Sequence, residues 1–425
     1  MTDLVLAHPA GRPVIKRSRV RPWAVAGAAL LTMLATAAAI GAPGVLIIPL
    51  SQEFGWSTAS ISSALAVRSV LFGLMGLAAA PLMNALGLRR VMLAALLLVG
   101  TGLLASLAMT RIWHLVLLWG ALIGIGSGAT ALVLGATVAT RCFPRRSGFV
   151  MGVLGAGAAA GPLVVLPAIS ALAEAGGWRA AVFALVVLAA LAAVAVLVLV
   201  PEESGGADDG LGRIGRSGGN EPAAIALHGA ARSGIFWVLL GTFAICGAAT
   251  SGLVQTHFVP FCADYGLSSF RAANVLALMG PLAVLGSLGA GWLSDRFDGG
   301  WLLFWFYGLR GLSLLCLPFT DFSLTALAVF GMFYGLDWIA TVPPTVKLIV
   351  LRFGRERATL ILGWIFAGHQ FGAAAAVFAA GHLRDASAGY LPAFLVAGVL
   401  CLFAAAALPV LSVPAGSGLG GRDRT

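Results

Sequence analysis

The chain has 425 residues, of which 60% are hydrophobic and only 10% are charged, and its formal net charge is +10. Soluble globular domains carry about 25% charged residues, so this composition excludes a water-soluble domain and indicates a chain surrounded largely by lipid. The basic charge does not indicate nucleic-acid binding, because Lys and Arg fall in short segments between apolar stretches. The five cysteines lack metal-ligand spacing, and we predict no metal or cofactor.

Apolar stretches long enough to cross a bilayer follow one another along the chain, since about 20 helical residues span its hydrocarbon core. We predict twelve, in two sets of six, at 23–50, 58–86, 91–109, 113–138, 147–173, 179–200, 234–258, 270–293, 301–319, 323–350, 358–381 and 390–411. The segment 201–233 between the sets is rich in Gly and charge and is predicted to be a flexible linker. The predicted fold is an all-α integral membrane protein with six-helix bundles at 23–200 and 234–411.

The distribution of basic residues predicts the orientation of these helices. With the N-terminus inside, most of the 26 Lys and Arg residues fall in cytoplasmic segments. The tails, 1–22 and 412–425, and the linker are therefore predicted to be cytoplasmic. The first apolar stretch is too long for the apolar region of a signal peptide and is followed by further stretches, so we expect it to stay as a helix.

The two halves repeat a pattern at the end of their second predicted helix. The first has GLAAAPLMNALGLRR at 76–90 and the second has GAGWLSDRFDGG at 289–300. Small residues let helices approach closely, and Asp295 beside Arg296 can form a charged latch at the membrane face. GWLSDRF resembles the loop signature of the major facilitator superfamily, and the resemblance covers nearly the full length. It implies two six-helix bundles, although Asn84 stands where that family usually has an acid.

A closer resemblance is to the bacterial relatives of the monocarboxylate transporters. The stretches that carry it are EFGWSTASIS at 53–62, RCFPRRSGFVMG at 141–152, GWRAAVF at 177–183 and HFVPFCADYGLSSFRAA at 257–273. The resemblance implies a secondary transporter of the cell inner membrane that moves small organic anions together with protons.

A second motif points to a different cargo. GAGAAAGP, which ends in Gly161 and Pro162, resembles the antiporter motif of drug exporters. In that reading Gly161 and Pro162 belong to a gating helix of an exporter of drug-like or toxic compounds. A face of Gly and Ala is also typical of tight helix packing, and both interpretations stay open here.

Asp337 is the one acidic residue of 16 that is predicted to lie deep within an apolar stretch. At 1.5 Å per residue Asp337 lies about 9 Å from the cytoplasmic face, and Arg310 on the preceding helix lies about 13 Å from the same face. We therefore predict an Arg310–Asp337 ion pair. It either locks two helices together or exchanges a proton during a transport cycle, because burial and a neighbouring arginine act in opposite senses on a carboxyl group.

Pro343 and Pro344 follow Asp337 closely and predict a break in its helix, since proline cannot donate a backbone hydrogen bond. Broken backbone at membrane depth is tolerated inside protein or beside a water-filled cavity. This pattern favours a gating helix that lines a transport path; the alternative is a static kink.

Three further polar residues are predicted near the middle of the membrane. Arg68, about 15 Å deep, can attract an anion and bind a carboxylate with two hydrogen bonds; the alternatives are pairing with Asp337 or a hydrated structural role. His369 and Gln370 reach a similar depth and are candidate substrate-binding residues, although a lone histidine is more often a satisfied interior residue.

Together these features predict a monomeric secondary active transporter that moves a small organic solute, most simply a carboxylate, by proton-coupled alternating access between two bundles. The alternative is a proton-driven exporter of drug-like compounds. A membrane enzyme is not predicted, because the sequence contains no HExxH or GxSxG motif and no cluster of histidines. No phosphate-binding GxxxxGK[ST] loop is present either, which excludes an ATP-driven mechanism of that type.

Overall fold

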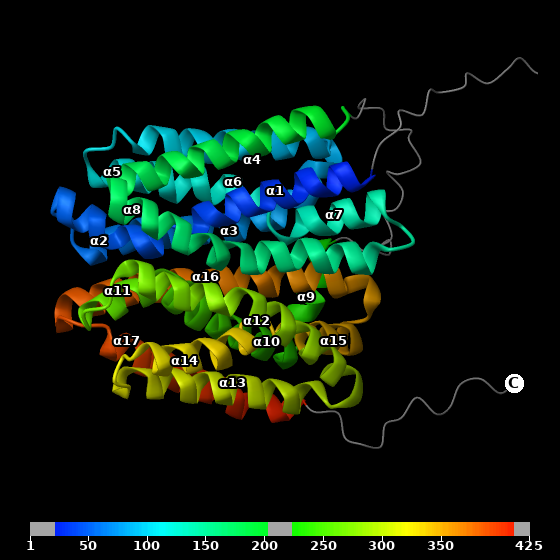
Figure 1. Cartoon of the computed structure of the whole chain (residues 1–425). Coiled ribbons are helices and arrows are strands. Elements are labelled where there is room, and N and C mark those ends of the chain that lie inside the picture. Colours follow the sequence, from blue (N-terminus) through cyan, green and yellow to red (C-terminus); the bar gives the residue numbers. More distant parts are fainter. Residues whose placement is uncertain (1–21, 203–222, 412–425) are drawn as a thin grey trace, which may run out of the picture.

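The computed structural model describes residues 22–202 and 223–411, and these residues fold as helices, with no strand among them. The predicted tails, apart from Pro22, and most of the predicted linker lie outside the described residues. In Figure 1 the helices of the first half are stacked beside those of the second half. Helices satisfy their own backbone hydrogen bonds, which lipid cannot do, so the predicted all-helical class is confirmed for the described part.

The first half contains long helices and several shorter pieces. Their bounds are α1 (Pro22–Gly41), α2 (Pro43–Phe54), α3 (Thr58–Leu86), α4 (Leu88–Ser106), α5 (Ile112–Leu115), the π-helix η1 (Val116–Ile123), α6 (Gly124–Ala129), α7 (Leu132–Cys142) and α8 (Ser147–Leu199).

The second half repeats this arrangement. Its bounds are α9 (Ala223–Ala231), α10 (Gly234–Gly247), the π-helix η3 (Ala248–Val254), α11 (Gln255–Asp264), α12 (Ser269–Arg296), α13 (Gly299–Cys316), η4 (Leu317–Phe319), α14 (Leu324–Asp337), α15 (Val342–Phe353), α16 (Arg355–Ser387), α17 (Leu391–Ala407) and η5 (Leu408–Leu411). The halves meet along two long helix pairs, α3 with α16 and α8 with α12.

Eleven helical segments among the described residues are long and apolar enough to cross a membrane, against the twelve predicted. The difference lies in α8, which runs from Ser147 to Leu199 and covers both the fifth and the sixth predicted stretch. Gly177 alone in α8 has a non-helical backbone, with φ 77° and ψ 169°. Glycine adopts this conformation without the steric cost that a Cβ atom imposes, and α8 turns back on itself in Figure 1.

The predicted flexible linker is wrong over its last third. Residues Ala223–Ala231 form α9, with the sequence AAIALHGAA, which contacts α10 and α16. Alanine has the highest helix propensity, and Ala226 and Ala230 are buried. The prediction gave the Gly-rich and charged composition of the whole segment more weight than this short Ala-rich run.

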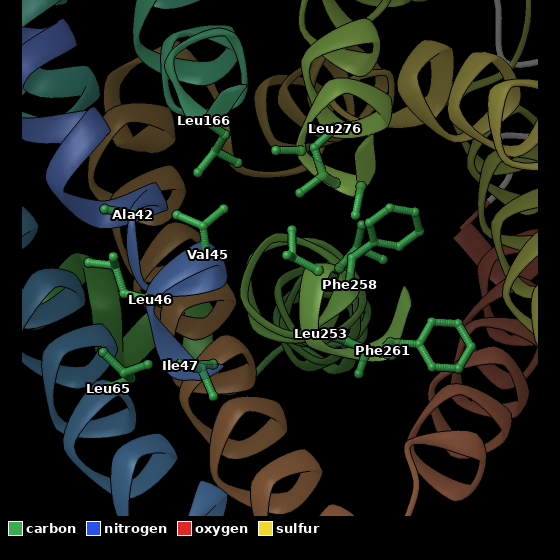
Figure 2. Close-up of a cluster of buried hydrophobic side chains, with 14 of the residues drawn as sticks. Ala42, Val45, Leu46, Ile47, Leu65, Leu166, Leu253, Phe258, Phe261 and Leu276 are labelled. Carbon is green, nitrogen blue, oxygen red and sulfur yellow. The ribbon is translucent and has the colours of Figure 1, made fainter. Parts of the chain in front are cut away.

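The buried apolar side chains form three clusters with different membership. One lies within the first half, among α1, α3, α4, α7 and α8, and one within the second half, around α10, α13, α15 and α16. The third, the shared core, joins both halves at the end of the molecule where α2, α5 and α11 lie in Figure 1. Figure 2 shows Val45 and Leu46 of α2 on one side of the shared core and Phe258 of α11 with Leu276 of α12 on the other.

Candidate functional site

The helix that carries Asp337 is interrupted, as the two prolines predicted. α14 ends at Asp337, a turn follows, and α15 begins at Val342 with Pro343 and Pro344 in its first turn. Proline is well tolerated there because the first N–H groups of a helix have no partner within it. The N–H of Ala340 donates to the Asp337 carbonyl over 3.2 Å, so the break is a tight turn rather than a gentle bend.

The predicted ion pair between Arg310 and Asp337 is present at this break. Arg310 Nε lies 2.5 Å from Asp337 Oδ2, and Nη2 donates to the Asp337 carbonyl over 2.8 Å. The two residues are 1% and 9% exposed. The second carboxylate oxygen, Oδ1, is buried without a hydrogen-bond partner among the described residues. One oxygen is therefore held by the cation, while the other is free to carry a proton.

Cys246 also contacts Arg310, and sequence reasoning missed this contact. Arg310 Nη1 donates to Cys246 Sγ over 2.7 Å, and Thr341 Oγ1, in the turn after Asp337, lies 3.6 Å from the same sulfur. The sequence indicated only that Cys246, like the other cysteines, lacks metal-ligand spacing. No local signal could have found this contact, because Cys246 comes from α10 and meets Arg310 only when α10 and α13 pack together.

His369 and Gln370 link this cluster to the contact between the halves. His369 Nε2 lies 3.5 Å from Thr250 Oγ1, and Gln370 Nε2 lies 3.4 Å from His369 Nδ1. A side chain on Gly73 of α3 would lie 2.8 Å from Cβ of Gln370, so α3 and α16 approach each other closely here. Gln370 therefore lies at the interface between the halves, and His369 contacts it from within the second half.

Arg68 lies apart from the Arg310 cluster, within the first half. It is 3% exposed, and its Nη1 donates to the carbonyl of Ile40, near the end of α1, over 2.8 Å. Its Nε has no hydrogen-bond partner among the described residues. The ion pairs within 22–202 and 223–411 include none between Arg68 and Asp337. The pairing that the sequence left open is therefore absent from this conformation.

Gly157 and Gly161 of α8 lie against α1. A side chain on Gly161 would lie 2.9 Å from Leu34, and one on Gly157 would overlap Leu30. The helix continues without a break through Gly161 and Pro162; the side chain of Pro162 lies outside what the structure describes. This geometry favours the packing interpretation of GAGAAAGP, and a gating role for Gly161 and Pro162 stays a prediction.

At the end of the molecule that holds the shared core, each half caps a helix of the other. Asp385 of α16 accepts a hydrogen bond from the N–H of Ala59 in α3 over 2.8 Å, and Glu174 of α8 accepts one from the N–H of Phe270 in α12 over 2.9 Å. Carboxylates at helix N-termini are stabilised by the unpaired N–H groups there. We call Glu174 and Asp385 the cross-caps; they hold the two halves together at this end.

Glu53 joins α2 to α8 beside the cross-caps. Trp178 Nε1 donates to Glu53 Oε2 over 2.5 Å, and Arg179 Nη1 lies 2.6 Å from Oε1. These contacts hold the pKa of Glu53 below its ordinary value of 4.5, and the hydrogen bond from Trp178 has the largest effect. Partial burial acts in the opposite sense and raises the pKa. A cavity of about 500 Å³ lies between α2, α8 and Ser269 of α12, with Glu53 and Glu174 in its wall.

At the other end, the repeated motif makes a contact in each half. Arg141 Nη2 donates to Asn84 Oδ1 over 2.7 Å, so the amide accepts the hydrogen bond that an acid would accept. In the second half Lys347 Nζ donates to the carbonyls of Ser294 and Phe297. Asp295 is exposed, and it is Lys347, from α15, that joins α12 to its neighbour.

Comparison with known proteins agrees with this architecture. The family model described as Major Facilitator Superfamily matches residues 28–341. An uncharacterized MFS-type transporter, YcxA, of Bacillus subtilis is 30% identical over 174 residues, which cover 40% of this chain and 41% of YcxA. Monocarboxylate transporter 12 of Rattus norvegicus is 24% identical over 327 residues, or 68% of this chain and 64% of the relative.

A further relative, monocarboxylate transporter 13 of Rattus norvegicus, is 30% identical over 148 residues, which cover 34% of each chain. The chain thus spans less than two thirds of the length of each of these relatives. The family model nevertheless matches well over half of the chain, and the many apolar helices fit it. The chain belongs to the Major Facilitator Superfamily of membrane transporters.

Proposed function

We propose that this protein is a secondary active transporter that moves a small organic carboxylate together with a proton. Membership of the superfamily supports transport of a small molecule. The observation that carries proton coupling is the Arg310–Asp337 pair at a helix break, with one carboxylate oxygen held and the other buried without a partner in the part of the chain that the structure describes. A proton on Asp337 would weaken its attraction to Arg310 and release the break, which links protonation to helix movement.

The carboxylate cargo is supported by two observations. Relatives at low identity bear the name monocarboxylate transporter, and Arg68 is a buried cation whose Nε has no partner within 22–202 and 223–411. Arginine is suited to carboxylates because its planar fork donates two parallel hydrogen bonds. In this proposal Arg68 holds the substrate carboxylate, while His369 and Gln370 contact it from α16.

The arrangement of the cores supports alternating access. The halves share one core at the end with the cross-caps and have separate cores at the other end, as expected when two bundles rock about a central site. We propose twelve crossings, with Gly177 at the turn between two of them, in bundles 23–200 and 234–411. The distribution of basic residues supports cytoplasmic termini, and we propose that the protein acts as a monomer in the cell inner membrane.

The test is uptake into proteoliposomes with an alkaline interior, over a panel of labelled monocarboxylates and larger neutral or cationic compounds. Accumulation of one acid that collapses when a protonophore is added supports the proposal. If no acid enters, and a neutral or cationic compound instead moves against its gradient, the carboxylate proposal fails and the exporter replaces it. Empty liposomes and liposomes without a pH gradient are the controls.

A further inference from the structure

Arg310 makes contacts with two groups that can carry a negative charge, not one. Its Nε and Nη2 are used by Asp337, and its Nη1 lies 2.7 Å from Cys246 Sγ. Cys246 is 2% exposed and is the last residue but one of α10, directly before the π-helix η3. Such π-helical turns are frequent at functional sites. The guanidinium is thus shared between a carboxylate and a thiol.

A buried arginine is stabilised by a negative partner, because an uncompensated charge in a low-dielectric interior is costly. If Asp337 takes up a proton, Arg310 loses its counter-ion unless another group ionises. We propose that Cys246 is that group: its thiol proton passes to the Asp337 carboxylate, and the thiolate that remains pairs with Arg310. This inference rests on the proposed proton coupling and adds Cys246 to the coupling element.

The exchange keeps the charge of the cluster constant. The S–H bond of Cys246 breaks and an O–H bond forms on Asp337, so the cluster changes from Arg⁺, COO⁻ and SH to Arg⁺, COOH and S⁻. His369 lies beside the same cluster, because α10 and α16 meet closely where a side chain on Gly247 would overlap the His369 carbonyl.

The other titratable side chains around Arg310 are less suited to this role. Tyr307 donates its hydroxyl proton to the Thr242 carbonyl over 2.7 Å, and Tyr334 donates to the Ala249 carbonyl over 2.9 Å. Both hydroxyls are therefore engaged with backbone acceptors. The titratable and charged groups around Cys246, from α13, α14, α16 and α17, are Arg310, Asp337, His369, Tyr307, Tyr334 and Cys401.

The direct test is infrared difference spectroscopy of the purified protein during a pH titration. The Cys246→Ala variant identifies the S–H stretching band of Cys246, and Asp337→Asn identifies the carboxylic acid band of Asp337. Because the exchange keeps the charge of the cluster constant, lowering the pH does not drive it; the proposal expects the Asp337 acid band without a Cys246 S–H band at neutral pH, followed by return of the S–H band at lower pH. Growth of the acid band with an unchanged S–H band would overturn it.

Transport by two variants gives a second test. In Cys246→Ala, the ratio of pH-driven uptake to counterflow exchange should fall about 100-fold, the scale of a lost proton-transfer group. The same ratio should fall equally in Cys246→Ser, because a serine hydroxyl can accept the same hydrogen bond but does not ionise. Full coupling in Cys246→Ser would contradict the proposal. Cys262→Ala, at a buried cysteine of the shared core, is the matched control.

The two tests separate the inference from the proposed function. If reconstituted protein moves no acid but the infrared bands still exchange, the proposed carboxylate transport fails while the proton exchange between Cys246 and Asp337 stands. If pH-driven uptake of an acid is measured but the S–H band never changes, proton-coupled transport stands and the role of Cys246 falls.

Discussion

Two arginines are buried among the described residues, one in each half, and they have opposite surroundings. Arg310 is surrounded by protein partners: a carboxylate, a backbone carbonyl and a thiol. Arg68 has one backbone carbonyl and an Nε without a partner among the described residues. A buried cation with its own counter-ion can act as an internal switch, whereas one that lacks a counter-ion is suited to an anion from outside. The comparison favours a coupling role for the second half, through Arg310, and an anion-binding role for the first half, through Arg68.

The largest effect should come from removing the cation of the balanced cluster. Arg310→Leu leaves Asp337 buried without its partner, and breaking a buried pair in this way costs about 3–5 kcal/mol. We expect a large fall in the thermal unfolding temperature of the purified protein. Adding Asp337→Leu should restore most of that stability but not pH-driven uptake. An unfolding temperature unchanged in the single variant would show that the pair is dispensable for the fold.

Asp337→Asn tests the switch without removing Arg310. The amide cannot bind or release a proton, so we expect counterflow exchange to persist while accumulation driven by the pH gradient is lost. Both activities are measured in the same proteoliposomes, with Asp321→Asn, at an exposed loop residue, as the control. Equal loss of both activities would argue for a purely structural pair.

Arg68→Gln should weaken substrate binding rather than coupling. A hydrogen bond to a charged group contributes about 1.5–3 kcal/mol, and 1.4 kcal/mol is about tenfold in affinity, so the KM for the transported acid should rise at least tenfold. Arg68→Lys should be intermediate, because lysine keeps the charge but lacks the planar fork. A normal KM together with a lowered unfolding temperature would assign Arg68 to the structure alone.

The cross-caps should have a smaller effect, confined to their own end of the molecule. Removing a capping side chain costs about 0.5–2 kcal/mol, and both carboxylates are exposed, so we expect the lower part of that range. In the double variant Glu174→Gln, Asp385→Asn, the contact between α3 and α16 should open to solvent several-fold more often than in the parent. The readout is the labelling rate of Ser62→Cys, at a buried residue of α3, by a membrane-impermeant thiol reagent.

The smallest effect concerns the pH dependence of stability at the same end. The pKa of Glu53 is lower in the folded protein than its ordinary value of 4.5, chiefly because of Trp178. Its contribution to stability is therefore present above pH 4.5 and is lost as the pH falls through the lowered value. Unfolding temperatures measured across this range should show a shallower decline for Glu53→Gln than for the parent. Identical pH profiles would show that the contact is energetically neutral.

The sequence by itself determined the features that depend on composition and on position along a helix. Low charge and long apolar stretches required a helical membrane protein, because lipid cannot satisfy backbone polar groups. The adjacent prolines Pro343 and Pro344 favoured a break, because proline lacks the N–H that continues a helix. The Arg310–Asp337 pair was predictable because both residues lie on consecutive helices at known depths, so 1.5 Å per residue was enough to bring them together.

Only the tertiary structure decided the contacts between helices that are distant in sequence. Cys246 meets Arg310, Asp385 caps α3 and Arg68 reaches the Ile40 carbonyl because whole helices pack in a particular rotation. Spacing along one helix does not specify which of its faces meets which neighbour. Composition predicted a flexible linker where the structure has α9, and the reason is the same. Ala226 and Ala230 of α9 become buried only when this helix packs against α10 and α16 of the second half.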